Sequence, residues 1–379
     1  MFSAFVFSVG LYWKLCRQSL SRSGGLGPVT LKGRLLRLLL YLLFAPVFLI
    51  HWLGFLLDEI FFRDYRKVAI KEPVFVLGVP RSGTTFLHRT LAADKKLFTS
   101  VSTWEVFLAP SISQRVFWRL LGRFDRLLGR PFGRLINHLE KRLFSGLEGI
   151  HDVSLQAAEE DYLLLLPLMS CFILFLPFTE SSYIWNLSRL DWQMPEADRQ
   201  RIMQFYRASL QKHLYFHGKE LRYLSKNASF ASWVQTLQKS FPDARFIVCL
   251  REPDKAVPSL LGSLASGAEF FELDLHSGRL PAQLVEMMQC FYQHLLTDWQ
   301  PDWELVQMHE LKSGIDGRIA SLYRHLGLPM TREYQQELAV QAAQARQFTP
   351  RTRPIDPSAG MADVYFRERF PWYYRILEA

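Results

Sequence analysis

The segment VFVLGVPRSGTTFLHRTL, residues 74–91, decides the fold of this chain. It opens with a run of apolar and β-branched residues that ends in Gly78, which is typical of a buried strand. Gly83, Thr84 and Thr85 follow, and the apolar spacing after them predicts a helix. A strand, a glycine loop and a helix in this order indicate a loop that binds phosphate through backbone N–H groups and the helix N-terminus.

The loop departs from those that bind nucleoside triphosphates. Its two glycines have the spacing of G-x-x-x-x-G-K-[ST], but Thr84 stands where that pattern has lysine, and Arg81 lies inside the loop. In triphosphate enzymes the lysine reaches the β- and γ-phosphates, and an aspartate at a second strand helps to hold Mg²⁺. Here the best second strand, residues 245–250, is followed by Arg251, which suits another phosphate and cannot hold a metal. The pattern predicts two anion contacts and no metal.

Strand and helix patterns alternate through residues 71–379. A helical pattern covers residues 198–216, and residues 303–311 contain a further strand pattern. The apolar stretch 157–178 predicts a core helix broken by Pro167. We therefore expect an α/β catalytic domain, with a P-loop-like parallel sheet flanked by helices.

An N-terminal basic and hydrophobic region, residues 1–70, precedes this domain. Residues 38–57 contain no Asp, Glu, Lys or Arg and have about the length of a membrane-spanning helix. Three interpretations remain open: a spanning helix with a cytosolic N-terminus, a kinked helix in the membrane plane, or a core helix. Pro46, His51 and the flanking charges favour the in-plane helix. We expect membrane association through residues 1–70.

The composition is that of a globular protein. The chain has 379 residues, of which 49% are hydrophobic and 21% charged, and a formal net charge of +9. The excess positive charge lies in residues 11–37 and 115–142, which fits phosphates or an anionic membrane surface, and we expect no nucleic-acid partner. The four scattered cysteines show no metal-ligand or disulfide spacing.

The two anion segments resemble those of sulfotransferases that use 3′-phosphoadenosine 5′-phosphosulfate (PAPS), and in particular the mostly bacterial branch with a P-R-S-G-T-T loop. Residues 78–91 are similar to the family's 5′-phosphosulfate loop, and residues 245–264 to its 3′-phosphate segment. The resemblance covers roughly residues 71–355, where Arg351 and Arg353 are similar to a basic loop over the nucleotide. It implies PAPS as co-substrate.

The resemblance implies roles for eight residues at this donor. Arg81 matches the cation beside the sulfuryl bridging oxygen, and Arg251 and Ser259 match the pair that binds the 3′-phosphate. Lys226 matches a family lysine that is usually followed by Ser-Pro or Asn-Pro, in place of the Asn-Ala found here. The residues that match the 5′-phosphate contacts are Ser82, Gly83, Thr84 and Thr85.

An acceptor hydroxyl also needs a general base. Glu105 lies where the resembling enzymes often place a carboxylate near the acceptor, although a carboxylate there also suits capping of its own helix. His151, Glu159 and Glu160 are rival candidates. We expect His88, on the loop's own helix, to serve packing.

These observations favour a membrane-associated sulfotransferase that acts on a hydroxyl or amine of a lipid- or glycan-like acceptor. An atypical P-loop kinase or NTPase is the alternative, and a non-catalytic membrane scaffold is a third interpretation. For location we expect the cytoplasmic face of a membrane, and the alternative is a single-pass type II Golgi enzyme with a lumenal domain. Neither the acceptor nor the oligomeric state is predicted by the sequence.

Overall fold

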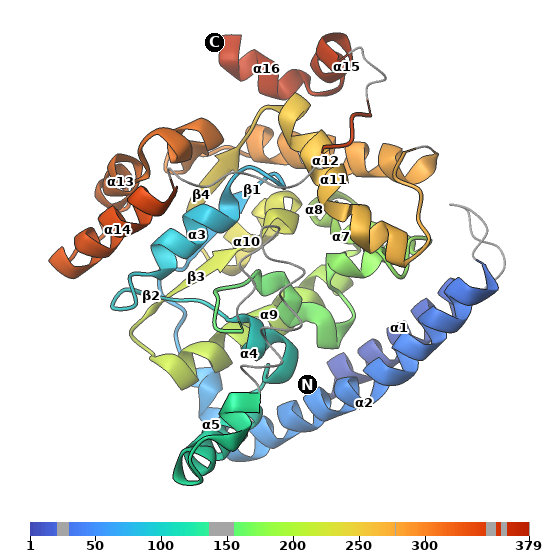
Figure 1. The fold of residues 1–379 in the computed structure, drawn as a ribbon, viewed down its shortest axis with the longest axis vertical. Coiled ribbons are helices and arrows are strands. Elements are labelled where there is room, and N and C mark those ends of the chain that lie inside the picture. Colours follow the sequence, from blue (N-terminus) through green and yellow to red (C-terminus); the bar gives the residue numbers. More distant parts are fainter. Residues whose placement is uncertain (21–29, 136–154, 277, 346–353, 358–361, 379) are drawn as a thin grey trace.

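The computed structural model describes residues 1–20, 30–135, 155–276, 278–345, 354–357 and 362–378 (Figure 1). Its five strands form one all-parallel sheet in the order β2-β3-β1-β4-β5. The strands are β1 (Val74–Gly78), β2 (Phe98–Thr99), β3 (Arg222–Lys226), β4 (Arg245–Leu250) and β5 (Glu304–Gln307).

The described helices surround this sheet. The α-helices are α1 (Phe2–Leu20), α2 (Leu31–Phe61), α3 (Thr84–Ala92), α4 (Thr103–Leu108), α5 (Ile112–Leu127), α7 (Ser182–Leu187), α8 (Leu190–Gln193), α9 (Glu196–His217), α10 (Val234–Ser240), α11 (Pro253–Phe270), α12 (Arg279–Thr297), α13 (Met308–His325), α14 (Arg332–Ala345), α15 (Ala362–Arg369) and α16 (Pro371–Glu378). The 3₁₀ turns are η1 (Arg63–Lys67), η2 (Asp161–Leu168), η3 (Phe172–Phe175) and η4 (Ala228–Ser232).

Both faces of the sheet are buried, as the central strand illustrates. Side chains alternate along a strand, so Val74 and Val76 point to one face of β1 and Phe75 and Leu77 to the other. The first pair shares a core with α3, α13 and α14, and the second pair shares a larger core with α9, α10 and α12. The expected α/β fold with a parallel sheet between helices is confirmed (Figure 1).

The strand order places a switch point at β1. Its two neighbours, β3 and β4, both come later in the chain and lie on opposite sides of it. The register pairs Val76 with Lys226 and Gly78 with Cys249, so the carboxyl ends of the three strands lie side by side. Ligands of open α/β sheets bind at such an edge, where the strand order reverses.

The apolar stretch 157–178 corrects one expectation, because it does not form an α-helix. It forms the 3₁₀ turns η2 and η3, joined through Met169 in a left-handed conformation (φ 57°). Pro167 lacks the N–H group that an α-helix needs, and nearly every side chain of η2 is buried. Because the segment is enclosed on nearly all sides, packing against the surrounding core determines its conformation, and not the apolar periodicity of an amphipathic helix.

The N-terminal region shares a hydrophobic core with the rest of the chain. Trp52 and Phe55 of α2 both contact the ring of Phe205 on α9, with centroid distances of 5.9 and 5.5 Å. Asp58 and Lys212 form a fully buried ion pair at 2.8 Å between the same two helices. The hydrophobic core therefore crosses the boundary that we predicted at residue 70.

Helix α2 is longer than the predicted apolar stretch. Among the described helices it is the one that is long and apolar enough to cross a membrane, and a third of its most apolar window is buried. A core helix or a signal sequence meets the same criteria of length and composition.

Candidate functional site

The glycine loop is built by close backbone packing. Gly78 has φ of 154°, and a Cβ atom on it would lie 2.4 Å from the carbonyl oxygen of Cys249 on β4. Gly83 has φ of 91°, and its Cβ would lie 2.6 Å from Sδ of Met308. Both positions therefore require glycine, because a side chain would collide with a neighbouring element and strain the backbone.

The loop closes on itself and leads into a helix N-terminus. The Ser82 hydroxyl donates to the Val79 carbonyl at 2.7 Å, which holds the turn shut. Thr84 and Thr85 form the first turn of α3, which contains no acidic residue. The positive end of the helix dipole and its free N–H groups therefore meet at the loop, as an anion site needs.

Three of the residues predicted to bind PAPS converge from separate segments of the chain. Arg81, whose backbone is left-handed (φ 70°), donates from Nε to Oγ of Ser259 on α11 at 3.1 Å. Arg251 donates from Nη1 to the Arg81 carbonyl oxygen at 3.1 Å. Burial, together with the neighbouring charge of Arg251, lowers the pKa of Arg81. Two guanidinium groups held this close favour an anion between them.

Lys226 ends β3 at the same edge of the sheet. Its side chain is buried, and its ammonium group pairs with the carboxylate of Glu160. Glu160 directly precedes η2, and its side chain is 23% exposed, so it reaches both the lysine and solvent. The structure thus places Glu160 at the carboxyl end of β3, the strand next to β1, which leads into the glycine loop.

Glu105 lies in a different environment. It caps its own helix: Oε2 accepts from the Ser102 N–H at 2.9 Å and from the Ser102 hydroxyl at 2.8 Å. Its other oxygen, Oε1, lies 2.6 Å from Nε2 of His217, 3.3 Å from Nε of Arg115 and 3.7 Å from Nδ1 of His213. Burial acts to raise the pKa of Glu105, but the Arg115 guanidinium and the two histidines hold it well below its usual range.

The histidines of this cluster lie beside the start of β3, whereas α4 follows the carboxyl end of β2 and is bonded to Ala157 through the Thr103 N–H at 3.1 Å. The Nε2 atom of His213 is hydrogen-bonded to Thr99 of β2 at 2.7 Å, and Thr99 pairs with Tyr223 near the start of β3. Tyr223 precedes Lys226 by three residues, or roughly 10 Å along a strand. Glu105 therefore lies beside the first half of β3, whereas Glu160 lies beside its end.

The cluster is also a group that could hold a metal. Glu105, His213 and His217 each offer a ligand atom, all within 4.8 Å of one another, as found among the described residues. The Arg115 guanidinium shares the oxygen that a metal would need, which favours an ion-pair network over a cation site. Neither Arg115 nor the histidines had a sequence signal, because they come from helices that meet only in the fold.

A buried carboxyl group follows Glu160 in the chain. Asp161 is almost fully buried, and the Tyr206 hydroxyl donates to its Oδ2 atom. Burial raises the pKa of Asp161 to about 7. Oδ1 has no hydrogen-bond partner among the described residues. A buried carboxyl group with one unpaired oxygen favours its neutral, protonated form.

The remaining predicted residues divide into two sets. His88 is fully buried, with Nε2 3.1 Å from the Ser100 hydroxyl, and burial lowers its pKa to about 3, which agrees with a packing role. His151, Arg351 and Arg353 lie outside the described residues. Within the described part, Ile355 donates its N–H to the Pro258 carbonyl at 3.0 Å, one residue before Ser259.

The fold and this edge define an α/β protein with a phosphate loop and a second arginine site on the adjacent strand. The chain belongs to the sulfotransferase family, whose sequence profile matches residues 73–332. Two solved structures are similar in fold. The sulfotransferase STF1 from Mycobacterium tuberculosis has a TM-score of 0.65 at 19% identity, over 97% of this chain and 91% of that one. The sulfotransferase STF9 from Mycobacterium avium has a TM-score of 0.65 at 17% identity, over 84% and 79%. A search of curated protein sequences gave no match.

Membership of the family establishes sulfotransferase activity as the function of the chain, and the family implies PAPS as the donor. The residues present fit such a donor. A glycine loop, a helix N-terminus and two convergent arginines provide contacts for two separate phosphate groups.

Proposed function

We propose that this sulfotransferase transfers the sulfuryl group of PAPS by in-line displacement, without a metal, to a hydroxyl or amine of a lipid- or glycan-like acceptor. The observation that carries the proposal is the convergence of Arg81, Ser259 and Arg251 beside the glycine loop. The two arginines supply the positive charge that a metal provides in phosphoryl-transfer enzymes.

In this proposal the loop and α3 bind the 5′-phosphate, and Arg81 neutralises the oxygen that separates from sulfur. Charge stabilisation at the leaving oxygen is the main requirement of such a transfer, together with in-line positioning. Arg251 and Ser259 bind the 3′-phosphate, which distinguishes PAPS from ADP and ATP. Tyr292 supports this arrangement, because its hydroxyl donates to the Arg251 carbonyl oxygen at 2.5 Å.

For the general base we propose Glu160. It is partly exposed and pairs with Lys226 at the carboxyl edge, so its carboxylate is accessible to an acceptor hydroxyl. The sequence favours Glu105 as the base, with Glu160 among its rivals. The burial of Glu105 and its bonds to Ser102 and Arg115 favour a structural role instead.

The acceptor class and the location are part of the same proposal. The long apolar helix α2 and the exposed apolar side chains of α5 support an acceptor that is reached at a membrane surface. The cytoplasmic face is our preferred location, and the lumenal domain of a type II Golgi protein is the alternative.

Donor binding can be tested by thermal shift with 3′,5′-ADP, 5′-ADP, ATP and ATP·Mg²⁺. A ligand that binds the native state raises the unfolding temperature by mass action. We expect 3′,5′-ADP alone to stabilise the protein, and Arg251→Ala to abolish this shift. Arg245→Ala is the matched control, because Arg245 starts the same strand and pairs with Glu72. Equal or stronger stabilisation by ATP·Mg²⁺ would favour the kinase or NTPase alternative.

A further inference from the structure

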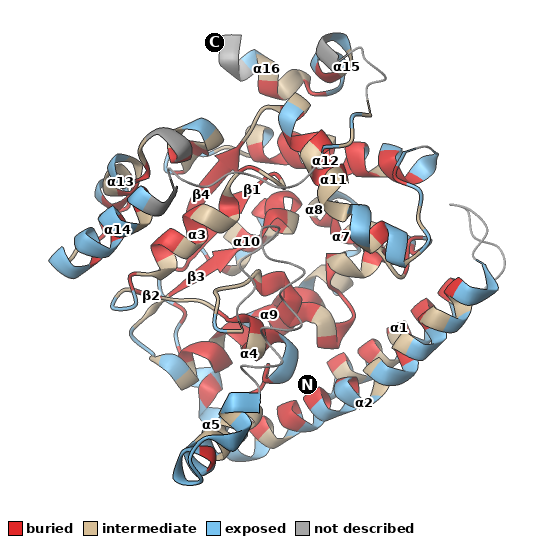
Figure 2. Cartoon of the chain, in the orientation of Figure 1, coloured by how far each residue is buried: buried red, intermediate tan, exposed pale blue. Residues whose placement is uncertain are grey.

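Helix α2 has two opposite faces. Its buried side chains, which include Tyr41, Phe48, Trp52, Phe55 and Asp58, lie on the half that faces the domain. At 100° per residue, the exposed apolar side chains, apart from Val47, fall on the other half. They are Leu31, Leu35, Leu38, Leu39, Leu42, Leu43, Val47, Leu49, Ile50, Leu53, Leu56, Ile60 and Phe61. Figure 2 shows this exposed side along the outer edge of α2.

The helix is attached to the domain at both ends. Near its C-terminus, Asp58 binds Lys212 and accepts from the N–H groups of Ile112 and Ser113 at 3.0 and 2.7 Å. At the start, the Thr30 hydroxyl donates to the Glu272 carboxylate at 2.6 Å.

The middle of α2 is attached as well. Arg37 donates to the Phe271 carbonyl oxygen at 3.1 Å, and Trp52 Nε1 donates to that of Pro167, also at 3.1 Å. The attached span from Thr30 to Asp58 is roughly 40 Å long, more than the hydrocarbon thickness of a bilayer. If α2 crossed a membrane, the polar domain attached along it would have to enter the bilayer with it. A position along the membrane surface avoids that cost.

Helix α5 meets α2 at Asp58 and carries a second exposed apolar stripe. Its exposed side chains at Phe117, Leu120, Phe124 and Leu127 follow the i, i+3, i+4 spacing of one helix face. Five exposed arginines accompany the stripe in residues 112–135, and the one acid there, Asp125, is buried. The arginines are Arg119, Arg123, Arg126, Arg130 and Arg134.

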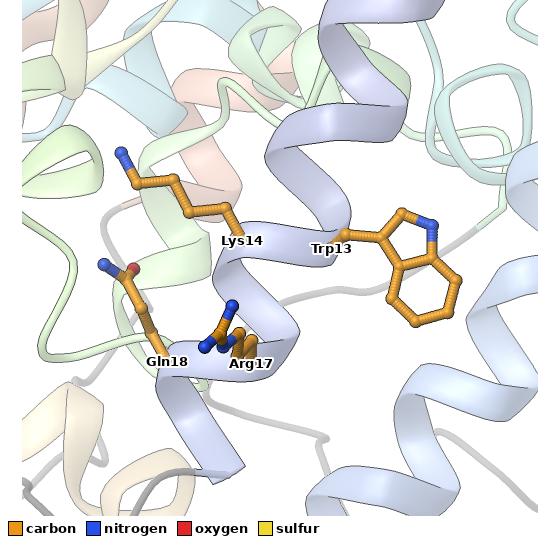
Figure 3. Close-up of a pocket in the computed structure, with 4 residues that line it drawn as sticks. All are labelled: Trp13, Lys14, Arg17 and Gln18. Atoms are coloured by element: carbon orange, nitrogen blue, oxygen red, sulfur yellow. The ribbon is translucent and has the colours of Figure 1, made fainter.

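A basic helix with an exposed apolar stripe is typical of a protein that lies in an anionic membrane interface. Helix α1 adds an aromatic and basic group of the kind found at membrane interfaces. Trp13, Lys14, Arg17 and Gln18 line a hollow of about 440 Å³, with the indole ring directed away from Lys14 and Gln18 (Figure 3).

We propose that the chain binds one leaflet of an anionic bilayer, with α2 in the membrane plane and α5 beside it, and does not span the membrane. This sharpens the membrane association proposed above. It is independent of the transfer chemistry, because vesicle binding and donor binding are measured separately. The charge of α5 favours lipid over a second copy of the chain, whose matching face would bring like charges together.

Flotation of the full chain with vesicles tests this surface. We expect binding to vesicles of phosphatidylcholine with phosphatidylglycerol, and weaker binding at high salt or to phosphatidylcholine alone. Replacing Leu42, Leu49 and Leu53 together by Asn should lower the partition coefficient by roughly tenfold or more. Val340→Asn is the matched control, since Val340 is 54% exposed on α14 and its replacement should change nothing.

Arg123→Gln combined with Arg126→Gln should weaken binding to the anionic vesicles by roughly tenfold. Binding to phosphatidylcholine vesicles should not change. The 3′,5′-ADP thermal shift of each variant verifies its fold. Unchanged vesicle binding by the leucine variant would overturn the proposal. So would a dimeric wild type that this variant converts to a monomer without loss of vesicle binding, because the face would then be a dimer interface.

Labelling with an impermeant maleimide distinguishes an in-plane helix from a spanning one. Lys32, in the first turn of α2, and Lys67, which follows its C-terminus, are exposed positions for Lys32→Cys and Lys67→Cys, and the four native cysteines are buried. The reagent is added to intact and to lysed spheroplasts that express the chain. We expect the two positions to behave alike, with both labelled in intact spheroplasts or both labelled only after lysis. Labelling from opposite sides would show that α2 spans the bilayer and would overturn the proposal.

Discussion

Two carboxylates lie beside opposite halves of strand β3, and both contact cationic side chains. Glu105 is 1% exposed, and its oxygens are occupied by Ser102, Arg115 and His217. Glu160 is partly exposed and pairs with Lys226, at the edge where the phosphate loop begins. The solvent exposure of a carboxylate and its place along the strand, more than the number of nearby charges, distinguish a structural carboxylate from a candidate base.

The largest expected effect lies at the carboxyl edge. Arg81→Ala should lower kcat/KM by about 10³-fold or more, because it removes the charge beside the leaving oxygen. Steady-state kinetics with saturating acceptor measures this. Arg245→Ala, which removes an arginine at the other end of β4, should retain activity, and equal losses in the two variants would contradict the assignment.

The second effect is on stability at the other half of β3. Glu105→Gln should lower the free energy of unfolding by about 3–4 kcal/mol, because it leaves the fully buried Arg115 without its counter-charge. Urea unfolding measures the loss. At a temperature where the variant is folded, kcat should stay within about threefold of wild type, below the 10²-fold or greater effect of a lost general base. A large fall in kcat with normal stability would restore Glu105 as the base.

Glu160→Gln should affect activity more than stability, in contrast to Glu105→Gln. We expect kcat to fall by about 10²-fold or more, since the acceptor would lose its general base, while the 3′,5′-ADP thermal shift persists. The split between kcat and donor binding provides a readout that a packing defect would not give: kcat should fall while the KM for PAPS stays within about threefold of wild type. A variant with unchanged kcat would place the base elsewhere, with Glu105, His151 and Glu159 as the remaining candidates.

The smallest effect is a pH dependence of stability. The pKa of Asp161 is about 7 in the fold, against 3.8 for an ordinary aspartate. The folded state therefore holds a proton that the unfolded state releases, so this contribution is complete below about pH 4 and is lost as the pH rises through 7. Asp161→Asn cannot ionise, so its stability relative to wild type should rise by roughly 1–3 kcal/mol from pH 4 to pH 7. A pH-independent difference in urea unfolding would contradict this.

The parts of the fold that depend on local backbone geometry could be predicted from the amino-acid sequence. Gly78 and Gly83 mark a loop that only glycine fits, and the apolar runs of β1 and β4 predict buried parallel strands. Arg251 could be predicted as a second anion contact because it directly follows a strand. In a parallel sheet, the residues that follow neighbouring strands meet at one edge.

Contacts between distant side chains depend on how the elements pack. The pairing of Glu160 with Lys226 and the enclosure of Glu105 by Arg115 and His217 join segments up to 112 residues apart. The attachment of α2 through Asp58 and Lys212 spans 154 residues. Side chains carry no local pattern for such contacts, because their partners come from other elements. Burial and charge pairing, which give each group its role, arise only when the chain is packed.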